Sequence, residues 1–290
     1  MKKLTGFIIV TLILFGQLLY AQNDDSQKHP LLEDSFIFTA GVFFPNKSLK
    51  LSVDGTVELP PDVELPEDDI DIGENFDVSQ YQTTFATGFQ WRFGKTKKWK
   101  LLADYFGIYN RWKGTLDESI EWEDIIYDVD AEVRAGMDLS IIRSRIGRAI
   151  SIGQKHELGV NLGAHIMVFN AFIEGEGRIA EDDEEVAGEF RRGGVDATAP
   201  LPNIGAWYYW APSEKWLLTA DVDWLYIVFG EFQGGLWDLK GGVQYQIIDW
   251  FGVGANYRYF NVNFEVDKSD WKGTLDLNFT GPSVLVNFNF

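Results

Sequence analysis

The sequence predicts an all-β protein: a transmembrane antiparallel up-and-down β-barrel of ten strands that follows a cleaved signal peptide. Three observations lead to this prediction. A short apolar leader opens the chain, long segments alternate apolar and polar residues with a period of two, and the expected connections alternate between short and long. No run of about 18 apolar residues follows the leader, so we expect no transmembrane helix.

The leader has the three parts of a signal peptide. A basic pair precedes an apolar run over 4–20, and a polar segment begins directly after Ala21, where we expect cleavage. The alternative, an uncleaved membrane anchor, prefers about 20 apolar residues, more than this run supplies. The expected division is a signal peptide over 1–21, a periplasmic N-terminal segment over 22–33 and a single barrel domain over 34–290.

Alternation defines the strands. In 156–172, for example, Leu158, Val160 and Leu162 share one face, opposite Glu157 and His165. A second, weak alternation over 47–57 leaves open either an external hairpin or a barrel of twelve strands. The ten expected strands are 35–44, 80–93, 98–110, 129–147, 155–173, 197–210, 215–229, 234–248, 251–264 and 280–290.

A soluble β-sandwich would alternate as well, but three features favour a membrane barrel. Many segments exceed the roughly 5–6 residues usual for strands of globular proteins. Trp and Tyr gather near strand ends, as in the girdles at membrane interfaces, and the polar face carries ionisable groups, as a barrel lumen does. Only a closed barrel satisfies every backbone group in lipid without using a helix.

Connection lengths indicate the orientation. Outer-membrane barrels have short periplasmic turns and longer external loops. The expected connections follow this rule with an even number of strands, which places both termini in the periplasm. The long, acidic external loops are expected near 45–79, 111–128, 174–196 and 265–279.

The chain ends in an alternating segment, Val284 to Phe290, with a terminal aromatic residue. With the leader and the strand parity, it resembles bacterial outer-membrane β-barrel proteins, most loosely the OmpA/OmpW-like small barrels. It is also similar to an uncharacterised group of such barrels with a Trp-Arg-Phe-Gly turn, here 91–94, and a late Gly-Pro, here 281–282. The resemblance implies the outer membrane of a Gram-negative bacterium, contact with the lipid bilayer and lipopolysaccharide, and an assembly machinery that reads Phe290.

Charge limits the partners. The chain has 44 acidic against 25 basic residues, a net charge of −19, so nucleic acid is excluded as a partner. It has no cysteine, hence no disulfide and no thiolate metal site. We expect no cofactor. The acidic loops are either solvated and extended or bind divalent cations weakly. The speculative cation ligands are Asp182, Asp183, Glu184 and Glu185.

The polar face carries charges of both signs, which favours a salt-bridged plug or a narrow pore for small solutes or ions. We therefore expect a non-enzymatic barrel. The alternative is an outer-membrane hydrolase, a protease or lipid-modifying enzyme, with its site at the external end of the lumen. His165 would be the base beside Asp221 or Asp223, and Ser140 the nucleophile. The basic segments 95–98 and 143–148 are expected in periplasmic turns. The expected lumen charges are Arg92, Lys100, Asp104, Glu132, Arg134, Asp138, His165, Asp221, Asp223, Lys240 and Arg258.

Overall fold

The computed structural model describes residues 28–55, 83–116, 120–122, 125–179, 189–230, 232–267 and 271–290. Within these ranges, no helix has the length and apolar character needed to cross a membrane. The described elements are α2 (Pro30–Glu33), β1 (Phe36–Phe43), β2 (Asn46–Gly55), β3 (Thr84–Phe93), β4 (Trp99–Thr115), β5 (Ile120–Trp122), β6 (Ile125–Tyr127), β7 (Glu132–Ile152), β8 (His156–Ile179), β9 (Glu189–Trp210), β10 (Trp216–Phe229), β11 (Phe232–Ile248), β12 (Phe251–Asp267) and β13 (Trp271–Asn289).

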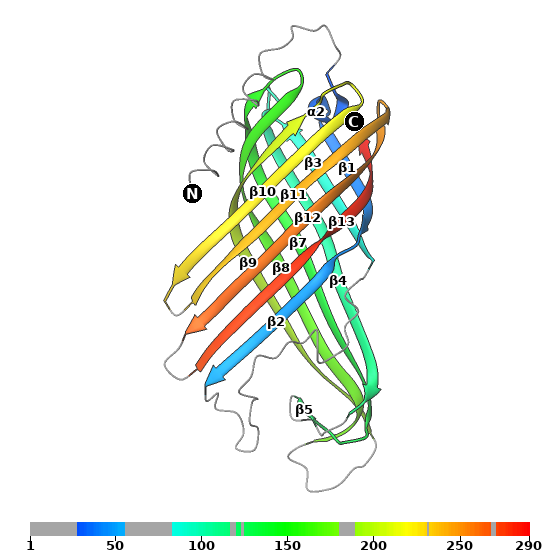
Figure 1. The fold of residues 1–290 in the computed structure, drawn as a ribbon, viewed down its shortest axis with the longest axis vertical. Helices are drawn as coiled ribbons and strands as arrows, with labels where there is room; N and C mark the ends of the chain where they lie inside the picture. The colour runs from blue at the N-terminus through cyan, green and yellow to red at the C-terminus, as the bar shows by residue number, and fades with distance from the viewer. Residues whose placement is uncertain are drawn as a thin grey trace, which may run out of the picture.

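Ten of these strands close into a barrel (Figure 1). Hydrogen-bonded neighbours follow the order β8, β7, β4, β3, β1, β13, β12, β11, β10 and β9, and β9 pairs with β8 to complete the ring. The pairings around the ring are antiparallel. The predicted all-β, ten-strand barrel is therefore confirmed.

Strand β2 accounts for the weak alternation that left twelve strands open. It pairs with β13 beyond the segment that β1 occupies, so it continues the first strand and adds no new position to the ring. Pro45 separates the two strands, because a proline has no N–H to continue the ladder. The short strands β5 and β6 form a hairpin beside β8, outside the ring.

The outward face of the barrel is apolar. On β8, for example, Leu162 is 63% exposed whereas His165, on the opposite face, is fully buried. On β10, Trp216 and Trp224 mark two aromatic levels eight residues apart, roughly 20 Å along the axis at about 3.4 Å per residue and about 40° of tilt. This height is close to that of a hydrocarbon layer. Other exposed apolar residues are Phe38, Phe85, Ile146, Ile204, Leu218, Leu239, Val253 and Val284.

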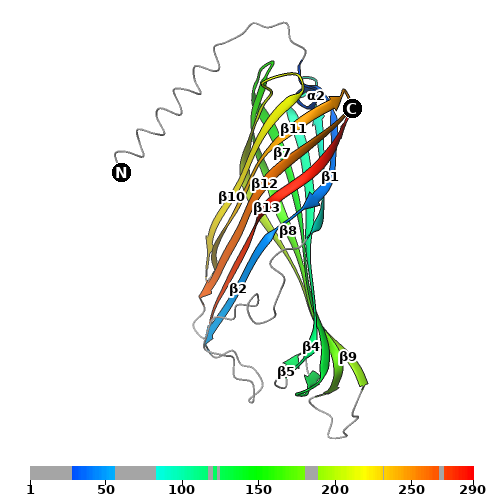
Figure 2. The same ribbon diagram turned by 45° about the vertical axis from the view of Figure 1, so that its right-hand side comes forward.

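Several strands extend well beyond this apolar belt. Strand β8 has 24 residues, whereas about 9–11 residues span a bilayer. Figures 1 and 2 show β4, β7, β8 and β9 diverging from β10–β13 and β2 at the end of the molecule opposite α2 and the C-terminus. We call the end that carries α2 and Phe290 the terminal end, and the other the distal end.

The long distal strands correct the expected loops. Strand β12 reaches Asp267 and β13 begins at Trp271, so most of 265–279 is a hairpin and not a loop. Strands β8 and β9 likewise take up much of 174–196, and β4 takes up 111–115. The sequence of these segments lacks the regular apolar alternation that predicts a strand in the membrane. A sheet that extends past the membrane can face water, so its strands do not need that alternation. Most of 45–79 and the proposed signal peptide lie outside the described residues.

Candidate functional site

Helix α2 fills the terminal mouth of the barrel. Pro30 opens the helix, and His29 Nδ1 accepts a hydrogen bond from the Leu31 N–H at 3.2 Å. Leu31 and Leu32 are buried in a cluster with Trp207. Burial lowers the pKa of His29 to about 4, so its imidazole is neutral at pH 7. The described part of 22–33 thus packs inside the barrel mouth. Its two leucines find apolar partners there.

A buried ion cluster lies directly behind α2. Glu157 on β8 pairs with both Arg92 on β3 and Lys100 on β4, and all three side chains are at most 2% exposed. Trp207 Nε1 donates to the same carboxylate at 2.7 Å. Arg92 also donates to the Leu31 carbonyl at 2.8 Å, which ties the cluster to α2. The Lys100 ammonium lies over the ring of Trp207 at 4.9 Å, so an aromatic face offsets part of its charge.

Two glycines make room for this cluster. The Trp207 ring lies against Gly147 on β7 and Gly159 on β8. A Cβ built on Gly147 would come within 2.6 Å of the ring, closer than real Cβ atoms approach. Substitution there would have to move the indole and its hydrogen bond to Glu157.

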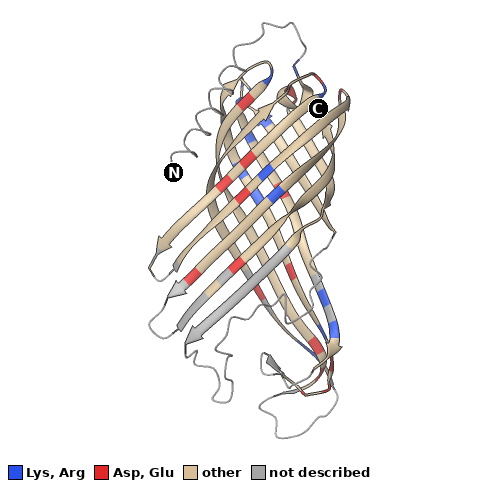
Figure 3. Cartoon of the chain, viewed as in Figure 1, with Lys and Arg blue, Asp and Glu red and all other residues tan. Residues whose placement is uncertain are grey.

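Farther toward the distal end, a layer of charged side chains crosses the lumen. Figure 3 shows basic and acidic positions grouped near mid-height on the barrel strands. Some of the layer's ion pairs join neighbouring strands of the ring, but others join strands that are not neighbours, such as Arg143 on β7 to Asp223 on β10 and His165 on β8 to Asp238 on β11, so the layer bridges the lumen. Seven of the nine are at most 6% exposed, and the most exposed carboxylate, Asp104, is 15% exposed. We call this set the charge layer: Asp104, Arg143, Arg145, His165, Asp221, Asp223, Asp238, Lys240 and Arg258.

Arg143 and Arg258 connect the charge layer. Arg143 Nε donates to Asp223 at 2.5 Å and lies 3.3 Å from Asp238. Arg258 forms two hydrogen bonds with Asp238, at 2.8 and 2.5 Å, and one with Asp104 at 3.2 Å. These contacts join β7 to β10 and β11, and β12 to β4. Charge-assisted bonds in a buried setting hold their partners strongly, so the layer acts as a cross-brace.

His165 and Arg145 complete the layer. His165 Nε2 lies 3.0 Å from Asp238 Oδ2, between β8 and β11. Arg145 reaches Asp221 at 3.3 Å and Asp104 at 3.5 Å. Asp104 thus receives three arginines, Arg143 among them.

An apolar layer lies above the charge layer on the distal side. Phe106 contacts Phe43 and Phe260 edge-to-face at 5.5 and 6.0 Å, and Phe260 stacks on Phe279 at 6.0 Å. The Arg258 guanidinium lies 4.2 Å above the Phe106 ring and links the two layers. These side chains are nearly inaccessible to water, so the lumen is dry at this height. The apolar layer is Phe43, Phe106, Ile108, Leu139, Ile141, Met167, Leu236, Phe260, Val262, Leu277 and Phe279.

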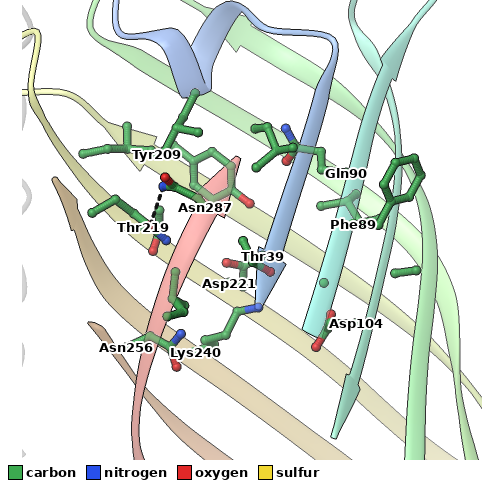
Figure 4. Close-up of a pocket in the computed structure, with 18 of the residues that line it drawn as sticks. Thr39, Phe89, Gln90, Asp104, Tyr209, Thr219, Asp221, Lys240, Asn256 and Asn287 are labelled. Carbon is green, nitrogen blue, oxygen red and sulfur yellow. Dashed lines mark hydrogen bonds between the residues drawn. The ribbon is translucent and has the colours of Figure 1, made fainter. Parts of the chain in front are cut away.

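A cavity of about 120 Å³ separates the charge layer from α2 (Figure 4). Thr39, Thr219 and Asn256 line it, together with Asp221 and Lys240 from the charge layer. Its size and polar walls suit several ordered water molecules. This cavity is the polar space that the lumen retains between two packed regions.

Eight of the eleven predicted lumen charges do face the lumen: Arg92, Lys100, Asp104, His165, Asp221, Asp223, Lys240 and Arg258. Arg134 and Asp138 do not. Arg134 is 62% exposed, and Asp138 pairs with Arg111 on the outward face. The expected orientation of β7 was wrong: the face that carries Leu139 and Ile141 points into the lumen, where both belong to the apolar layer, and the face of Arg134 and Asp138 points outward. Glu132 is exposed too.

Because of the same error, two arginines of the lumen were not predicted. Arg143 and Arg145 were expected in a periplasmic turn but lie in the middle of the lumen, fully or almost fully buried. Asp238 was not singled out either. The alternation on β11 could have identified it, because Asp238 lies between Trp237 and Leu239, which face outward.

The predicted catalytic set is not assembled. His165 pairs with Asp238 and not with Asp221 or Asp223. Ser140 is on the outer face of β7, where its hydroxyl lies 3.3 Å from that of Tyr105. The barrel wall therefore separates the candidate nucleophile from the candidate base.

Three charge-layer side chains have the composition of a metal site. The ligand atoms of His165, Asp223 and Asp238 lie within 4.8 Å of one another, the one such group among the described residues. Both carboxylates, however, already bind arginines, Arg143 and Arg258. The layer's four aspartates are matched by four Lys and Arg, so a divalent ion would add two buried positive charges. The donor set does not fit a metal ion. The proposed loop ligands, Asp182 to Glu185, lie outside the described residues.

Comparison with solved structures identifies the fold. The outer membrane protease OmpT from Escherichia coli matches with a TM-score of 0.51 at 11% identity, over 88% of this chain and 97% of that one. The chain has the fold of an outer-membrane β-barrel. OprG of Pseudomonas aeruginosa, an outer membrane protein, also matches, with a TM-score of 0.32 at 9% identity over 91% of this chain and 98% of that one.

The toluene transporter TodX of Pseudomonas putida matches with a TM-score of 0.35 at 9% identity, over 90% of this chain and 91% of that one. No protein-family model matches the sequence. No curated protein matches it either. At these identities the barrel shares an architecture with its structural neighbours, and its activity has to be argued from its own side chains.

Proposed function

We propose that the protein is an integral, non-enzymatic barrel of the outer membrane whose lumen is closed to water-soluble solutes and ions. The observation that carries the proposal is the pair of layers across the lumen. The charge layer is cross-braced by Arg143 and Arg258, and the apolar layer above it is packed around Phe106 and Phe260. An ion would have to break buried salt bridges and then cross a dry apolar zone, and both steps are costly.

The orientation is part of the proposal. The turns at the terminal end are short, such as 94–98 and 249–250, and the distal strands are long. Short turns face the periplasm in outer-membrane barrels. This supports periplasmic termini and a distal extension outside the cell. The partners proposed for this placement are the lipid bilayer, lipopolysaccharide and the machinery that assembles barrels. Divalent cations at the acidic distal segments are a further proposal.

The enzyme alternative has less support. One structural neighbour is a protease, but likeness at 11% identity concerns the fold alone. The arrangement of His165 and Ser140 on opposite sides of the wall favours a non-enzymatic barrel. The closed barrel thus acts as a rigid membrane anchor for the distal sheets.

Liposome swelling with small sugars, run beside a peptide and lipid hydrolysis screen, tests this proposal. We expect no swelling above protein-free liposomes and no hydrolysis. Swelling would contradict closure. Hydrolysis that is lost in the His165→Ala variant, but kept in the Ser140→Ala variant, would establish an enzyme that uses the charge layer.

A further inference from the structure

An arginine interrupts the apolar outer surface near the terminal end of the barrel. Arg148 is exposed on the outward face of β7, between Ile146 and Ile150, which are 49% and 62% exposed. Its partners on the neighbouring strands, Trp99 on β4 and Val160 on β8, are large, exposed apolar residues as well. A charged side chain next to hydrocarbon is costly unless it reaches the interface or meets an opposite charge. The surroundings of Arg148 therefore decide what it can bind.

Arg148 lies at the level of an aromatic girdle. Four rings follow one another around the wall, with centroids 6.1, 4.9 and 6.4 Å apart: Phe36, Trp91, Phe93 and Trp99. The Arg148 guanidinium continues this row, 5.6 Å from the centre of the Trp99 ring. Aromatic girdles mark the depth of the lipid headgroups in membrane barrels. The guanidinium thus lies at the depth of the lipid phosphates on the terminal side of the bilayer.

The cations at this rim lack acidic partners. Within the part of the chain that the structure describes, Arg148 pairs with no carboxylate, and neither do Lys95 and Lys98 of the turn between β3 and β4. The Ala149 N–H donates to the Lys98 carbonyl at 2.8 Å, which holds this turn against the strand that carries Arg148. Lys97, in the same turn, donates to a backbone carbonyl of α2 at 3.4 Å. The rim is therefore a local concentration of positive charge on a chain whose net charge is −19.

The exposed cations of the distal end differ in this respect. Each of three has a carboxylate within 4 Å: Arg111 with Asp138, Lys113 with Glu132, and Arg134 with Glu174. The protein thus supplies its own counter-ions to exposed cations outside the apolar belt, but not to those at the terminal girdle. An anion from the membrane itself can fill that role.

We propose that Arg148, with the lysines of the 94–98 turn, binds the phosphate of an anionic phospholipid in the periplasmic leaflet. The proposal rests on the placement and orientation proposed above, in which the terminal end lies at that leaflet. A guanidinium offers a phosphate two parallel N–H donors. The acyl chains of the lipid run from Arg148 toward the middle of the belt, over Ile146 and Leu162, which are cross-strand partners on β7 and β8.

A headgroup with a net negative charge fits this site better than a zwitterionic one. The turn lysines add to the attraction for negative charge at the membrane surface. A zwitterionic headgroup also carries an ammonium, and none of the described carboxylates pairs with the rim cations to receive it. A free phosphate ion is a poorer occupant, because it makes no use of the apolar surface beside the arginine.

Native mass spectrometry tests the headgroup selection. The folded full chain is mixed in detergent with equal amounts of phosphatidylglycerol and phosphatidylcholine that carry the same acyl chains, and it is then released from its micelles in the spectrometer. We expect the phosphatidylglycerol adduct to exceed the phosphatidylcholine adduct several-fold, although the chain as a whole is acidic. Equal adducts would overturn the inference and leave the membrane placement intact. A chain that does not float with vesicles in a parallel flotation assay would overturn both.

A matched pair of variants locates the selection. Arg148→Gln removes the guanidinium at the terminal girdle, and Arg134→Gln removes one at the distal end, where the side chain is 62% exposed. Neither side chain is buried, so both variants keep the packed lumen. We expect Arg148→Gln to bring the two adducts close to equality, while Arg134→Gln keeps the wild-type ratio. A wild-type ratio in Arg148→Gln would overturn the inference, and so would equal losses in the two variants.

Discussion

Removing the Glu157 carboxylate should destabilise the barrel strongly. In Glu157→Gln the shape is kept, but Arg92 and Lys100, both at most 2% exposed, lose the one carboxylate that they share. Leaving buried charges without their counter-ion typically costs about 3–5 kcal/mol. The remaining partners of the two cations, the Leu31 carbonyl and an aromatic face, carry no formal charge. We expect the free energy of unfolding to fall by about 3–5 kcal/mol.

Equilibrium urea unfolding in lipid vesicles measures this change, and the chain offers a matched control. Glu132 pairs with Lys113 on the surface, with side chains 68% and 54% exposed, so Glu132→Gln should change the free energy of unfolding far less than Glu157→Gln does. The triple variant Arg92→Met, Lys100→Met, Glu157→Met removes the charges together and should recover most of the loss. If Glu157→Gln changed stability no more than Glu132→Gln does, the buried cluster would not be the brace that we infer.

Three further results are expected. The pKa of His29 is lowered to about 4 from its ordinary 6.5, so the undocked segment binds a proton more readily. Docking of α2 should therefore weaken as the pH falls from about 6.5 to about 4, seen as faster amide exchange at Leu31 and Leu32, and His29→Gln should remove this dependence. The backbone N–H and carbonyl of Phe290 both form hydrogen bonds with Phe36, at 2.9 Å, and deleting Phe290 should reduce assembly into the outer membrane. Normal assembly of the deletion variant would show that Phe290 is not an assembly signal. Calcium titration calorimetry should give weak heats, with a Kd on the order of 10⁻⁴–10⁻³ M, and equal heats from a variant with Asp182 to Glu185 neutralised would exclude those ligands.

The architecture was predictable because alternation is a local property of the chain. On β8 and β10 it assigned His165, Asp221 and Asp223 to the lumen, and the structure places them there. The parity of connection lengths then gave an even-numbered ring of ten strands. Neither step needs knowledge of what lies across the lumen.

The candidate site was less predictable, because its lumen changes character along the axis. The apolar layer puts Leu139 and Ile141 inside, so β7 has apolar residues on both faces and its register is ambiguous in the sequence. Because of that ambiguity, Arg143 was predicted in a turn and Asp138 in the lumen. The partnership of His165 with Asp238 was also out of reach, since it joins β8 to β11 across the barrel and depends on how the ring closes.

The central claim, a lumen closed by a charge layer and an apolar layer, is tested most directly by planar-bilayer recording of the refolded full chain in molar salt. Insertion is verified in parallel by protease protection of the reconstituted protein. The account predicts no stepwise ion conductance from inserted wild-type protein. Reproducible conductance steps from the wild-type barrel would contradict it.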